Sequence, residues 1–317
     1  MKSGSFYAQS KNKSPKPAMN DYVKSPLNYT GGKTKLLPQI LPLFPRQIGT
    51  FVDLFCGGGN VGINVRAEQI IYNDSDPTVK RLLEFLKNTP ADAIESEIDR
   101  IISGYGLSDS RSFGYEKYNC DSSSGLADFN KDKYLALRKD FNSSDRQNTF
   151  QLLTLIIYGF NNQIRFNKKG EFNLPAGKRD FNNMIRSNLK VFSKTLSKQN
   201  AQILGKDFRK IDTTPLNEQA FVYCDPPYLI TTATYNERGG WTESDEKDLL
   251  KMLDELNNRT IRFALSNVME HNGKQNHLLS DWAEKYKINY LNYSYNNSNY
   301  HSSAKKHTTK EVLITNY

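Results

Sequence analysis

Two short apolar runs separated by a cluster of glycines restrict the fold of this chain more than any other feature. Residues 50–55 and 69–73 are rich in β-branched and aromatic side chains, so each run predicts a buried strand. Residues 61–67 between them predict a helix. Strand, turn, helix and strand in this order form one unit of an open parallel sheet. We therefore expect an α/β protein built on a Rossmann-like sheet.

The turn after the first run has the spacing of a nucleoside-binding loop. Gly57, Gly59 and Gly62 fit the pattern G-x-G-x-x-G, and Asp74 ends the second run. An acid at that strand end can accept hydrogen bonds from both ribose hydroxyls. The motif predicts a nucleoside cofactor but does not separate a dinucleotide from S-adenosylmethionine. A glycine-rich structural turn is the alternative interpretation.

A third apolar run, residues 220–224, ends at the tetrapeptide Asp225-Pro226-Pro227-Tyr228. Neither proline has an N–H group to donate, so the strand must stop at the aspartate. Ligands bind where strands end in an open α/β sheet. This stiff turn offers a carboxylate, two carbonyl groups with fixed directions and an aromatic ring, which together suit a planar ring that carries an amino group. An ordinary turn, in which the tyrosine packs on its neighbours, is the other interpretation.

Paired glycines also occur in residues 25–33, and they are followed by Lys33 at the expected start of a helix. Glycines let the backbone approach a ligand closely, and a lysine at a helix start can meet an anion. The segment is similar to a phosphate loop but lacks the full spacing of that motif.

The strand pattern disappears between residues 80 and 195, where helical periodicity predominates. We expect a mostly helical domain at 80–195, inserted into a sheet domain formed by residues 25–79 and 196–317, after a flexible basic tail at residues 1–24. The expected helices of the insertion are 79–86, 91–102, 134–141 and 149–160. Beyond it we expect strands at 201–204 and 261–265, helices at 244–256 and 278–286, and an antiparallel pair at 287–295 and 311–315.

The net charge of +9 fits a nucleic-acid partner, although a basic solvated surface is the commoner explanation of such a charge. Residues 158–179 combine basic, amide and aromatic side chains, which are the types that contact bases and phosphates. A solvated basic hairpin explains this composition equally well.

The three cysteines and four histidines show no disulfide, metal or triad spacing, so we expect no metal and place the histidines at the surface. No apolar run is long enough for a signal sequence or a membrane span. We therefore expect a cytoplasmic protein with no membrane partner.

Taken in this order, the motifs resemble those of the Dam-like family of DNA adenine-N6 methyltransferases. The resemblance covers residues 25–317 and also includes residues 164–175, Asp207-Phe208 and residues 311–317. It implies a Rossmann-like methyltransferase sheet with an inserted, mostly helical target-recognition domain. It also implies site-specific methylation of adenine N6 in double-stranded DNA by S-adenosylmethionine, with S-adenosylhomocysteine as the product.

The resemblance implies a catalytic role for Asp225, Pro226, Pro227 and Tyr228. The Asp225 carboxylate and the Pro226 carbonyl would accept the two amino hydrogens of the adenine and localise the lone pair of its nitrogen. Because the ring cannot reach the pocket while it is stacked in a duplex, the base must flip out, and Tyr228 would provide replacement stacking.

The same resemblance implies two further sets of residues. The cofactor-binding set is Tyr29, Lys33, Asp53, Phe55, Gly57, Gly59, Asp74, Asp207 and Phe208. Within it, Lys33 would reach the carboxylate region of the cofactor, Asp74 its ribose, and Asp207 with Phe208 its adenine ring. The DNA-binding set is Asn28, Asn161, Arg165, Asn167, Pro175, Lys178 and Arg179.

One departure concerns the target sequence. Relatives specific for GATC often have a lysine just before the equivalent of Tyr29, where it contacts guanine, but this chain has Asn28. We therefore expect an adenine in a short duplex site without assigning that site to GATC. We expect the protein on the nucleoid of a bacterial or phage-infected cell, and a cognate restriction endonuclease would be a genetic rather than a physical partner. Three rivals stay open: a nicotinamide-dependent oxidoreductase, a DNA-binding protein without catalysis, and a methyltransferase for RNA or a protein amide.

Overall fold

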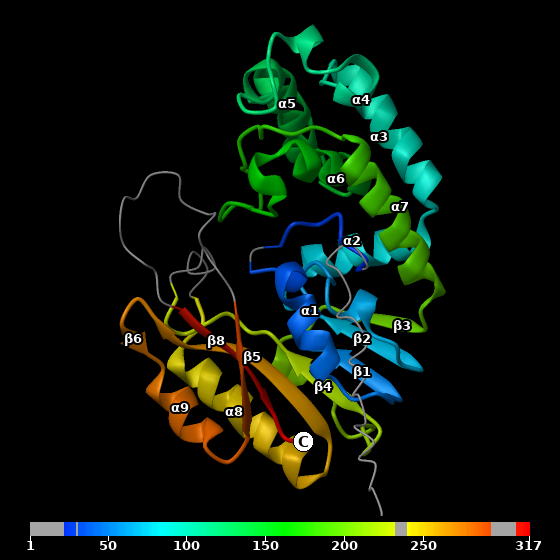
Figure 1. Ribbon diagram of the computed structural model, residues 1–317. Coiled ribbons are helices and arrows are strands. Elements are labelled where there is room, and N and C mark those ends of the chain that lie inside the picture. The colour runs from blue at the N-terminus through cyan, green and yellow to red at the C-terminus, as the bar shows by residue number, and fades with distance from the viewer. Residues whose placement is uncertain (1–21, 30, 232–239, 293–308) are drawn as a thin grey trace, which may run out of the picture.

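The computed structural model describes residues 22–29, 31–231, 240–292 and 309–317 (Figure 1). Nearly all of the expected basic tail at 1–24 lies outside the described residues. The same holds for most of residues 231–241, whose polar, glycine-containing sequence predicts a loop near the site. It also holds for residues 296–308, which include His301 and His307. Among the described helices, none combines the length and the apolar character needed to cross a membrane.

A mixed sheet in the order β3-β2-β1-β4-β5-β8-β7 forms the base of the molecule, and the short β6 pairs with β5. Strands β1 to β5 are parallel, and β8 runs antiparallel to β5 and β7. The bounds are β1 Thr50–Asp53, β2 Gln69–Asn73, β3 Ala201–Leu204, β4 Phe221–Cys224, β5 Arg262–His271, β6 Lys274–Gln275, β7 Lys287–Leu291 and β8 Thr309–Thr315. The predicted α/β class, with mostly parallel strands, is confirmed.

Side chains that alternate along each central strand enter two different cores. Phe51 of β1 and Tyr223 of β4 join the cluster on one face, while Val52 and Val222 join the cluster on the other. Both faces are therefore covered, as the continuous apolar runs require. Helices α8 (Glu243–Asn258) and α9 (His277–Ala283) pack on the second face, as Figure 1 shows.

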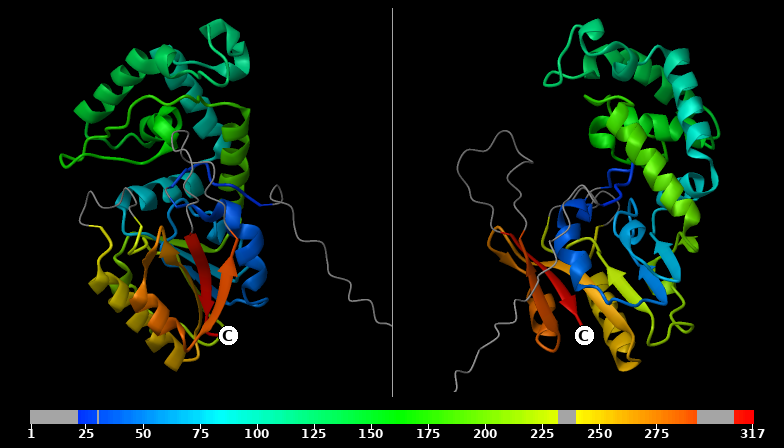
Figure 2. Two further views of the ribbon diagram at one scale, coloured as in Figure 1. Left: turned by 60° about the vertical axis from the view of Figure 1, so that its left-hand side comes forward. Right: turned by 45° about the vertical axis from the view of Figure 1, so that its right-hand side comes forward.

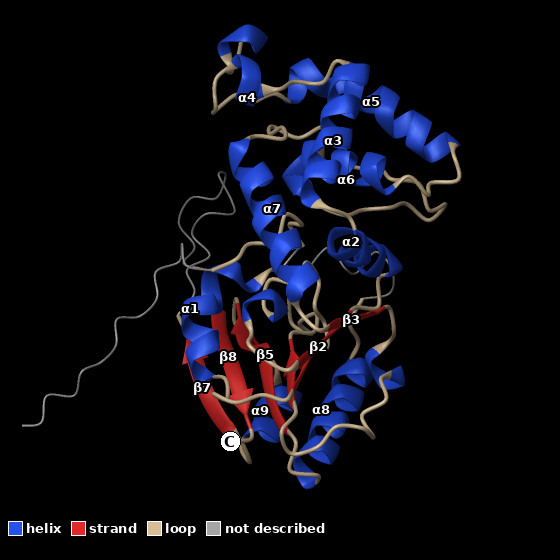
Figure 3. Cartoon of the chain, turned by 90° about the vertical axis from the view of Figure 1, so that its right-hand side faces the viewer, coloured by secondary structure: helices blue, strands red, loops and turns tan. Residues whose placement is uncertain are grey.

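Helices between β2 and β3 extend away from the sheet. They are α2 (Pro77–Asn88), α3 (Ala91–Tyr105), α4 (Ser110–Phe113), α5 (Ala127–Ser143), α6 (Thr149–Tyr158) and α7 (Asn183–Lys198). Figures 2 and 3 show α3, α4, α5 and α6 beyond α2, far from the strands. The predicted helices are confirmed, but the sequence interpretation missed α7. Its apolar positions have helical spacing, although a polar composition hides them: Ile185, Leu189, Phe192 and Leu196.

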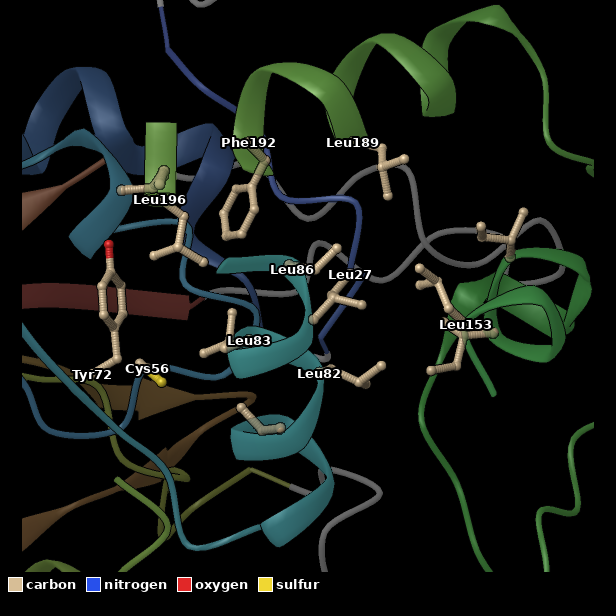
Figure 4. Close-up of a cluster of buried hydrophobic side chains, with 14 of the residues drawn as sticks. Leu27, Cys56, Tyr72, Leu82, Leu83, Leu86, Leu153, Leu189, Phe192 and Leu196 are labelled. Atoms are coloured by element: carbon tan, nitrogen blue, oxygen red, sulfur yellow. The ribbon is translucent and has the colours of Figure 1, made fainter. Parts of the chain in front are cut away.

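One hydrophobic cluster runs without interruption from the sheet into these helices (Figure 4). Leu82 and Leu86 of α2 lie between Phe192 of α7 and Leu153 of α6 in this view, and all four are fully buried. Burial of a leucine or phenylalanine side chain contributes about 1.5–3 kcal/mol. The shared cluster holds the helices firmly on the sheet, and the domain boundaries at residues 80 and 195 stay a prediction.

The helix expected at residues 61–67 is wrong, because this segment forms only the single 3-10 turn Gly62–Asn64. The Gln199 side-chain amide donates to the carbonyl groups of Gly62 and Ile63, at 3.3 and 3.4 Å, so these acceptors are used outside a helix. The segment is also rich in β-branched residues, which are weak helix formers.

Strands β1 and β4 are neighbours although residues 54–220 separate them, while β2 lies on the other side of β1. The chain therefore leaves β1 in one direction and returns beside it from the other. This arrangement makes the carboxyl ends of β1 and β4 a topological switch point, which is the usual ligand site of an open α/β sheet. Asp53 at the end of β1 pairs in register with Tyr223, two residues before Asp225.

Candidate active site

One cavity of about 1010 Å³ lies at the carboxyl ends of the parallel strands. This volume is at the upper end of the range for small-molecule sites, so more than one planar ligand can enter. The predicted site residues that line it are Tyr29, Lys33, Asp53, Phe55, Gly57, Asp74, Arg165, Asn167, Asp207, Phe208, Asp225, Pro226, Pro227 and Tyr228. The structure thus brings together the tetrapeptide, all of the predicted cofactor-binding set except Gly59, and only Arg165 and Asn167 of the predicted DNA-binding set.

The other predicted site residues do not line this cavity. Gly59 lies against Phe192 in the core, where an added Cβ would be 3.3 Å from the ring. The Asn28 side-chain amide donates to the carbonyl oxygen of Asn161 at 2.7 Å, which joins the N-terminal segment to the helical part. Three more are exposed on the helical part: Pro175, Lys178 and Arg179. Their DNA-binding roles stay predictions.

Asp53 occupies the end of β1 with only 1% of its surface exposed. Its Oδ2 accepts the backbone N–H of Gly62 at 3.0 Å. Burial raises the pKa of Asp53 to about 8, the Gly62 N–H opposes this rise, and the charges of Asp225 and Asp74 add to it. A carboxyl group in this state becomes ionised when a cationic group arrives beside it.

Gly57 turns the backbone under Tyr29 with a φ of +48°, in the left-handed region. An added Cβ would lie 2.7 Å from the Tyr29 ring, so only glycine lets the ring lie over this loop. The Gly57 N–H donates to Oδ2 of Asp74 at 2.9 Å, and the Asp76 N–H donates to Oδ1 at 2.9 Å. Burial raises the pKa of Asp74 to about 6. Each of its oxygens keeps a further lone pair for a hydroxyl donor.

An aromatic wall closes one side of the cavity. The rings of Phe55, Phe208 and Trp241 contact one another with centroids 5.5–5.7 Å apart. Trp241 precedes Thr242, whose side chain forms a capping box with Asp245 at the start of α8.

A buried carboxylate fixes the indole of this wall. Trp241 donates its ring N–H to Glu246 at 2.5 Å, and Glu246, which is fully buried, also accepts from the side-chain amides of Asn267 and Asn276. With every donor satisfied, the network holds Trp241 in one orientation.

Asp207 already has a partner. The Arg209 guanidinium lies 3.1 Å from its Oδ2 and also pairs with Asp245 and Asp248 of α8. The same guanidinium stacks over Phe208, with its carbon 4.4 Å from the ring centroid. Helix α8 therefore holds Asp207 and Phe208 in place, and their contact with the adenine ring of the cofactor stays a prediction.

Lys33 lies directly against the tetrapeptide. Its ammonium group is 2.8 Å from Oδ1 of Asp225, and Tyr228 donates its hydroxyl to the same oxygen at 3.1 Å. Burial raises the pKa of Asp225, whereas the charge and hydrogen bond of Lys33 and the Tyr228 hydroxyl lower it, and the result stays above the ordinary value. For Lys33, burial lowers the pKa, but Asp225 and Glu311 outweigh this effect, so the ammonium form persists.

These contacts leave the two oxygens of Asp225 unequal. Two donors occupy Oδ1, while no side chain or backbone N–H in the described parts of the chain donates to Oδ2. The residue lines the cavity with 17% of its side chain exposed. Oδ2 is therefore the acceptor that a ligand in the cavity can use.

A hairpin from the helical part reaches the same cavity. Phe166 pairs with Phe172 across it, and Arg165 and Asn167 line the cavity from this side. The hairpin holds Arg165 rigidly, because its guanidinium donates to the side-chain and backbone oxygens of Asn173 at 2.9 and 3.1 Å.

Helix α5 and the turn after it support this hairpin through side chains four residues apart. Arg138 donates to the Leu174 carbonyl at 2.7 Å, and Arg146 donates to the Gly170 carbonyl at 2.9 Å. Between them, Asn142 bonds both backbone groups of Phe172, at 2.9 and 2.8 Å, as a neighbouring strand would. The position of the hairpin therefore depends on α5.

Sequence reasoning missed three residues of the site. Trp241 ends the loop that was expected near the site, but no role was predicted for it. Glu311 lies in the C-terminal strand and is 2% exposed beside Lys33. His271, expected at the surface, is half-buried and lines the cavity, where its Nδ1 bonds the Thr309 hydroxyl at 2.8 Å. None has a local motif, because antiparallel pairing brings Glu311 and His271 to the site and the network around Glu246 holds Trp241 there.

Comparison with known proteins identifies a family. Residues 29–309 match the D12 class N6 adenine-specific DNA methyltransferase family. The chain is 42% identical to the Type II methyltransferase M.FokI of Planomicrobium okeanokoites over 94% of its length, and 41% identical to the modification methylase StsI of Streptococcus sanguinis over 98%. A DNA adenine methylase of Haemophilus influenzae is 28% identical over 64% of this chain and 63% of its own length.

The lengths differ between these relatives. The alignments cover only 43% of M.FokI and 47% of StsI, so this chain spans less than half the length of these two relatives.

Proposed function

This chain belongs to the D12 class of N6 adenine-specific DNA methyltransferases, and we propose that it transfers a methyl group from S-adenosylmethionine to the N6 amine of a flipped adenine in a short duplex DNA site. The observation that carries the proposal is the difference between the two oxygens of the Asp225 carboxylate. Its Oδ1 is held by Lys33 and Tyr228, while Oδ2 is left for a ligand in the cavity. The hairpin that carries Arg165 also lines this cavity.

The residues at the cavity fit S-adenosylmethionine. Asp53 and Asp74 provide negative charge for a cationic ligand, and Asp74 keeps lone pairs for ribose hydroxyls. Phe55 and Phe208 provide apolar ring surface, and the Gly57 turn lets the backbone approach closely. When bound, the cofactor would supply an activated methyl group on a sulfonium. The expectation that no metal takes part stays a prediction.

The protein's own contribution is orientation. Oδ2 of Asp225 and the Pro226 carbonyl would accept the two amino hydrogens, which favours the pyramidal amine with its lone pair free for attack. Pro226 and Pro227 fix this turn because each has a restricted φ. Lys33 favours the ionised form of Asp225, and the carboxylate would accept a hydrogen bond from the amine and then the proton that the methylated amine loses.

The target base must leave the duplex to reach this site, at a cost of a few kcal/mol. Tyr228 would stack on it, and this role is supported by the hydrogen bond of its hydroxyl to Asp225 and by the position of its ring in the cavity lining. Arg165 and Asn167, on the hairpin, would contact the flanking DNA. Double-stranded DNA is thus the proposed partner. M.FokI and StsI are named as a Type II methyltransferase and a modification methylase, which supports a role in restriction-modification beside a cognate endonuclease in a bacterial or phage-infected cell.

Incubation of duplex DNA with methyl-labelled S-adenosylmethionine, followed by mass spectrometry of the nucleosides, tests the proposal. We expect label in N6-methyladenine alone, at a short recurring sequence. Label in cytosine, RNA or protein would contradict it, as would tight NADH binding without S-adenosylmethionine binding.

A further inference from the structure

Glu311 stands out because it is buried beside a carboxylate that is itself buried. It is 2% exposed, and its Oε1 lies 3.5 Å from the Lys33 ammonium group. The single hydroxyl hydrogen of Tyr228 is shared between this oxygen, at 3.2 Å, and Oδ1 of Asp225, at 3.1 Å. Lys33 and Tyr228 therefore each bridge the two carboxylates, Asp225 and Glu311.

The sheet explains how a residue near the C-terminus reaches this position. Because β8 runs antiparallel to β5, its first residues lie at the edge where the parallel strands end. Glu311 pairs in register with Val268, next to an irregularity between Val268 and Glu270. Such bulges redirect side chains at sheet edges and beside active sites. Only an antiparallel strand could bring its start to this edge.

The charges indicate a functional reason for this arrangement. Among the described residues, Lys33 is the cation that contacts both carboxylates, at 2.8 Å from Asp225 and 3.5 Å from Glu311. Burial of a second carboxylate is unfavourable for stability, and local conflicts of this kind are expected at functional sites.

We propose that Glu311 is a positioning residue for methyl transfer, which holds Lys33 and the Tyr228 hydroxyl so that Asp225 and the Tyr228 ring keep the orientation that receives the adenine. The inference rests on the proposed function. When an amino hydrogen approaches Asp225, the lysine and the tyrosine remain fixed by Glu311, and Oδ2 stays available. Without Glu311, Lys33 would be drawn to Asp225 alone and would compete with the amine for its oxygens.

Three variants test this role: Glu311→Gln, which keeps an acceptor oxygen but removes the charge, Glu311→Ala, which removes both, and the matched control Glu270→Gln. Glu270 lies on β5 and pairs with Lys310 at the surface. Since small misplacements in a site cost up to about 100-fold in rate, we expect kcat to fall about tenfold in Glu311→Gln and about 100-fold in Glu311→Ala. Affinity for S-adenosylhomocysteine should stay within about threefold, because Glu311 is not among the residues that line the cavity. The control should match wild type in both.

A second test, thermal unfolding of the variants, does not depend on methylation. With Lys33 present, Glu311→Gln removes the ion pair with Lys33, whereas in a Lys33→Met background that ion pair is already absent. The change in Tm on Glu311→Gln should therefore be more positive in the Lys33→Met background, by about 3 °C or more.

The arms separate the two proposals. If the Tm changes differ between the two backgrounds as expected but the wild-type protein methylates no adenine, the proposed function is refuted. The interaction between Lys33 and Glu311 is then still supported. If the wild-type protein does methylate adenine, either of two results for the Glu311→Ala variant would overturn the proposed role of Glu311. In the first, Glu311→Ala keeps kcat within about twofold; in the second, its kcat falls only in step with cofactor affinity. Equal Tm changes in the two backgrounds would also overturn it.

Discussion

The ammonium group of Lys33 lies 2.8 Å from Oδ1 of Asp225, and only 4% of the lysine side chain is exposed. Burial raises the pKa of this carboxylate, and the ammonium group opposes that rise. The resemblance to the family had suggested that Lys33 reaches the carboxylate of the cofactor. That role stays a prediction, and the geometry adds a second one, at the tetrapeptide itself.

Removal of this cation should destabilise the protein strongly. Lys33→Met leaves Asp225 and Glu311 without their shared ammonium group, and loss of one partner of a buried ion pair costs about 3–5 kcal/mol. Urea unfolding followed by circular dichroism measures the change. Lys80→Met is the control, because Lys80 forms an exposed pair with Glu84 and such pairs contribute about 1 kcal/mol or less. Equal losses in the two variants would contradict the burial argument.

Gly57→Ala should weaken cofactor binding about tenfold, because the new Cβ collides with the Tyr29 ring and the backbone needs a positive φ. Binding can be followed by the fluorescence of Trp241 in a Trp282→Phe background, since the chain has two tryptophans.

Gly104→Ala is the matched control for this glycine. Gly104 lies in α3 with no atom within 4 Å of an added Cβ, so alanine should stabilise the helix by up to about 1 kcal/mol and leave binding unchanged. If Gly57→Ala binds the cofactor as tightly as Gly104→Ala does, the loop is not the cofactor cradle.

Asp53→Asn should weaken cofactor binding and should make the protein more stable than wild type at high pH. The folded-state pKa of Asp53 is raised from 3.8 to about 8, so the group favours the folded state below pH 4, and this contribution is lost as pH rises to about 8. The variant lacks that loss, so its stability relative to wild type should increase between pH 5 and pH 8.5. Its affinity for S-adenosylmethionine should fall about tenfold, since an ionic partner is removed. A stability difference that does not change with pH would show that Asp53 is not the titrating group.

Asn142→Ala should impair DNA recognition without touching the cofactor. It removes both bonds to the Phe172 backbone, at about 0.5–1.5 kcal/mol each, and loosens the hairpin that carries Arg165. We expect the KM for duplex DNA to rise about tenfold, with affinity for S-adenosylhomocysteine unchanged. Ser143→Ala, one residue further on the exposed side of α5, should behave as wild type. A KM as low as that of Ser143→Ala would mean that the hairpin does not depend on α5.

Local patterns were sufficient for part of this structure. The apolar runs, the prolines after Asp225 and the glycine turn are short-range signals, and the structure confirms the strands and turns that they predict. The helix predicted at 61–67 is only a 3-10 turn, whose Gly62 and Ile63 carbonyl groups also accept from the distant Gln199 amide, a contact that no local pattern reveals. Helix α7 was missed because its buried positions are diluted by Lys, Asn and Ser.

The site shows the same limit. Asp53, Asp74 and Asp225 each follow a recognisable strand, so their meeting at one edge could be predicted from the parallel topology. Glu311 and Trp241 could not be placed in this way. Glu311 reaches the edge through antiparallel pairing and a bulge, and Trp241 through a buried network around Glu246.

Methylation and DNA binding by Asp225→Ala test the central claim most directly. The variant and the wild type are compared with labelled S-adenosylmethionine on duplex DNA, and in parallel by DNA binding with S-adenosylhomocysteine present. We predict that the variant binds DNA within about tenfold of wild type and yet transfers no detectable label to adenine, since the acceptor of the amino hydrogen is gone. Transfer at the wild-type rate by Asp225→Ala would contradict the account.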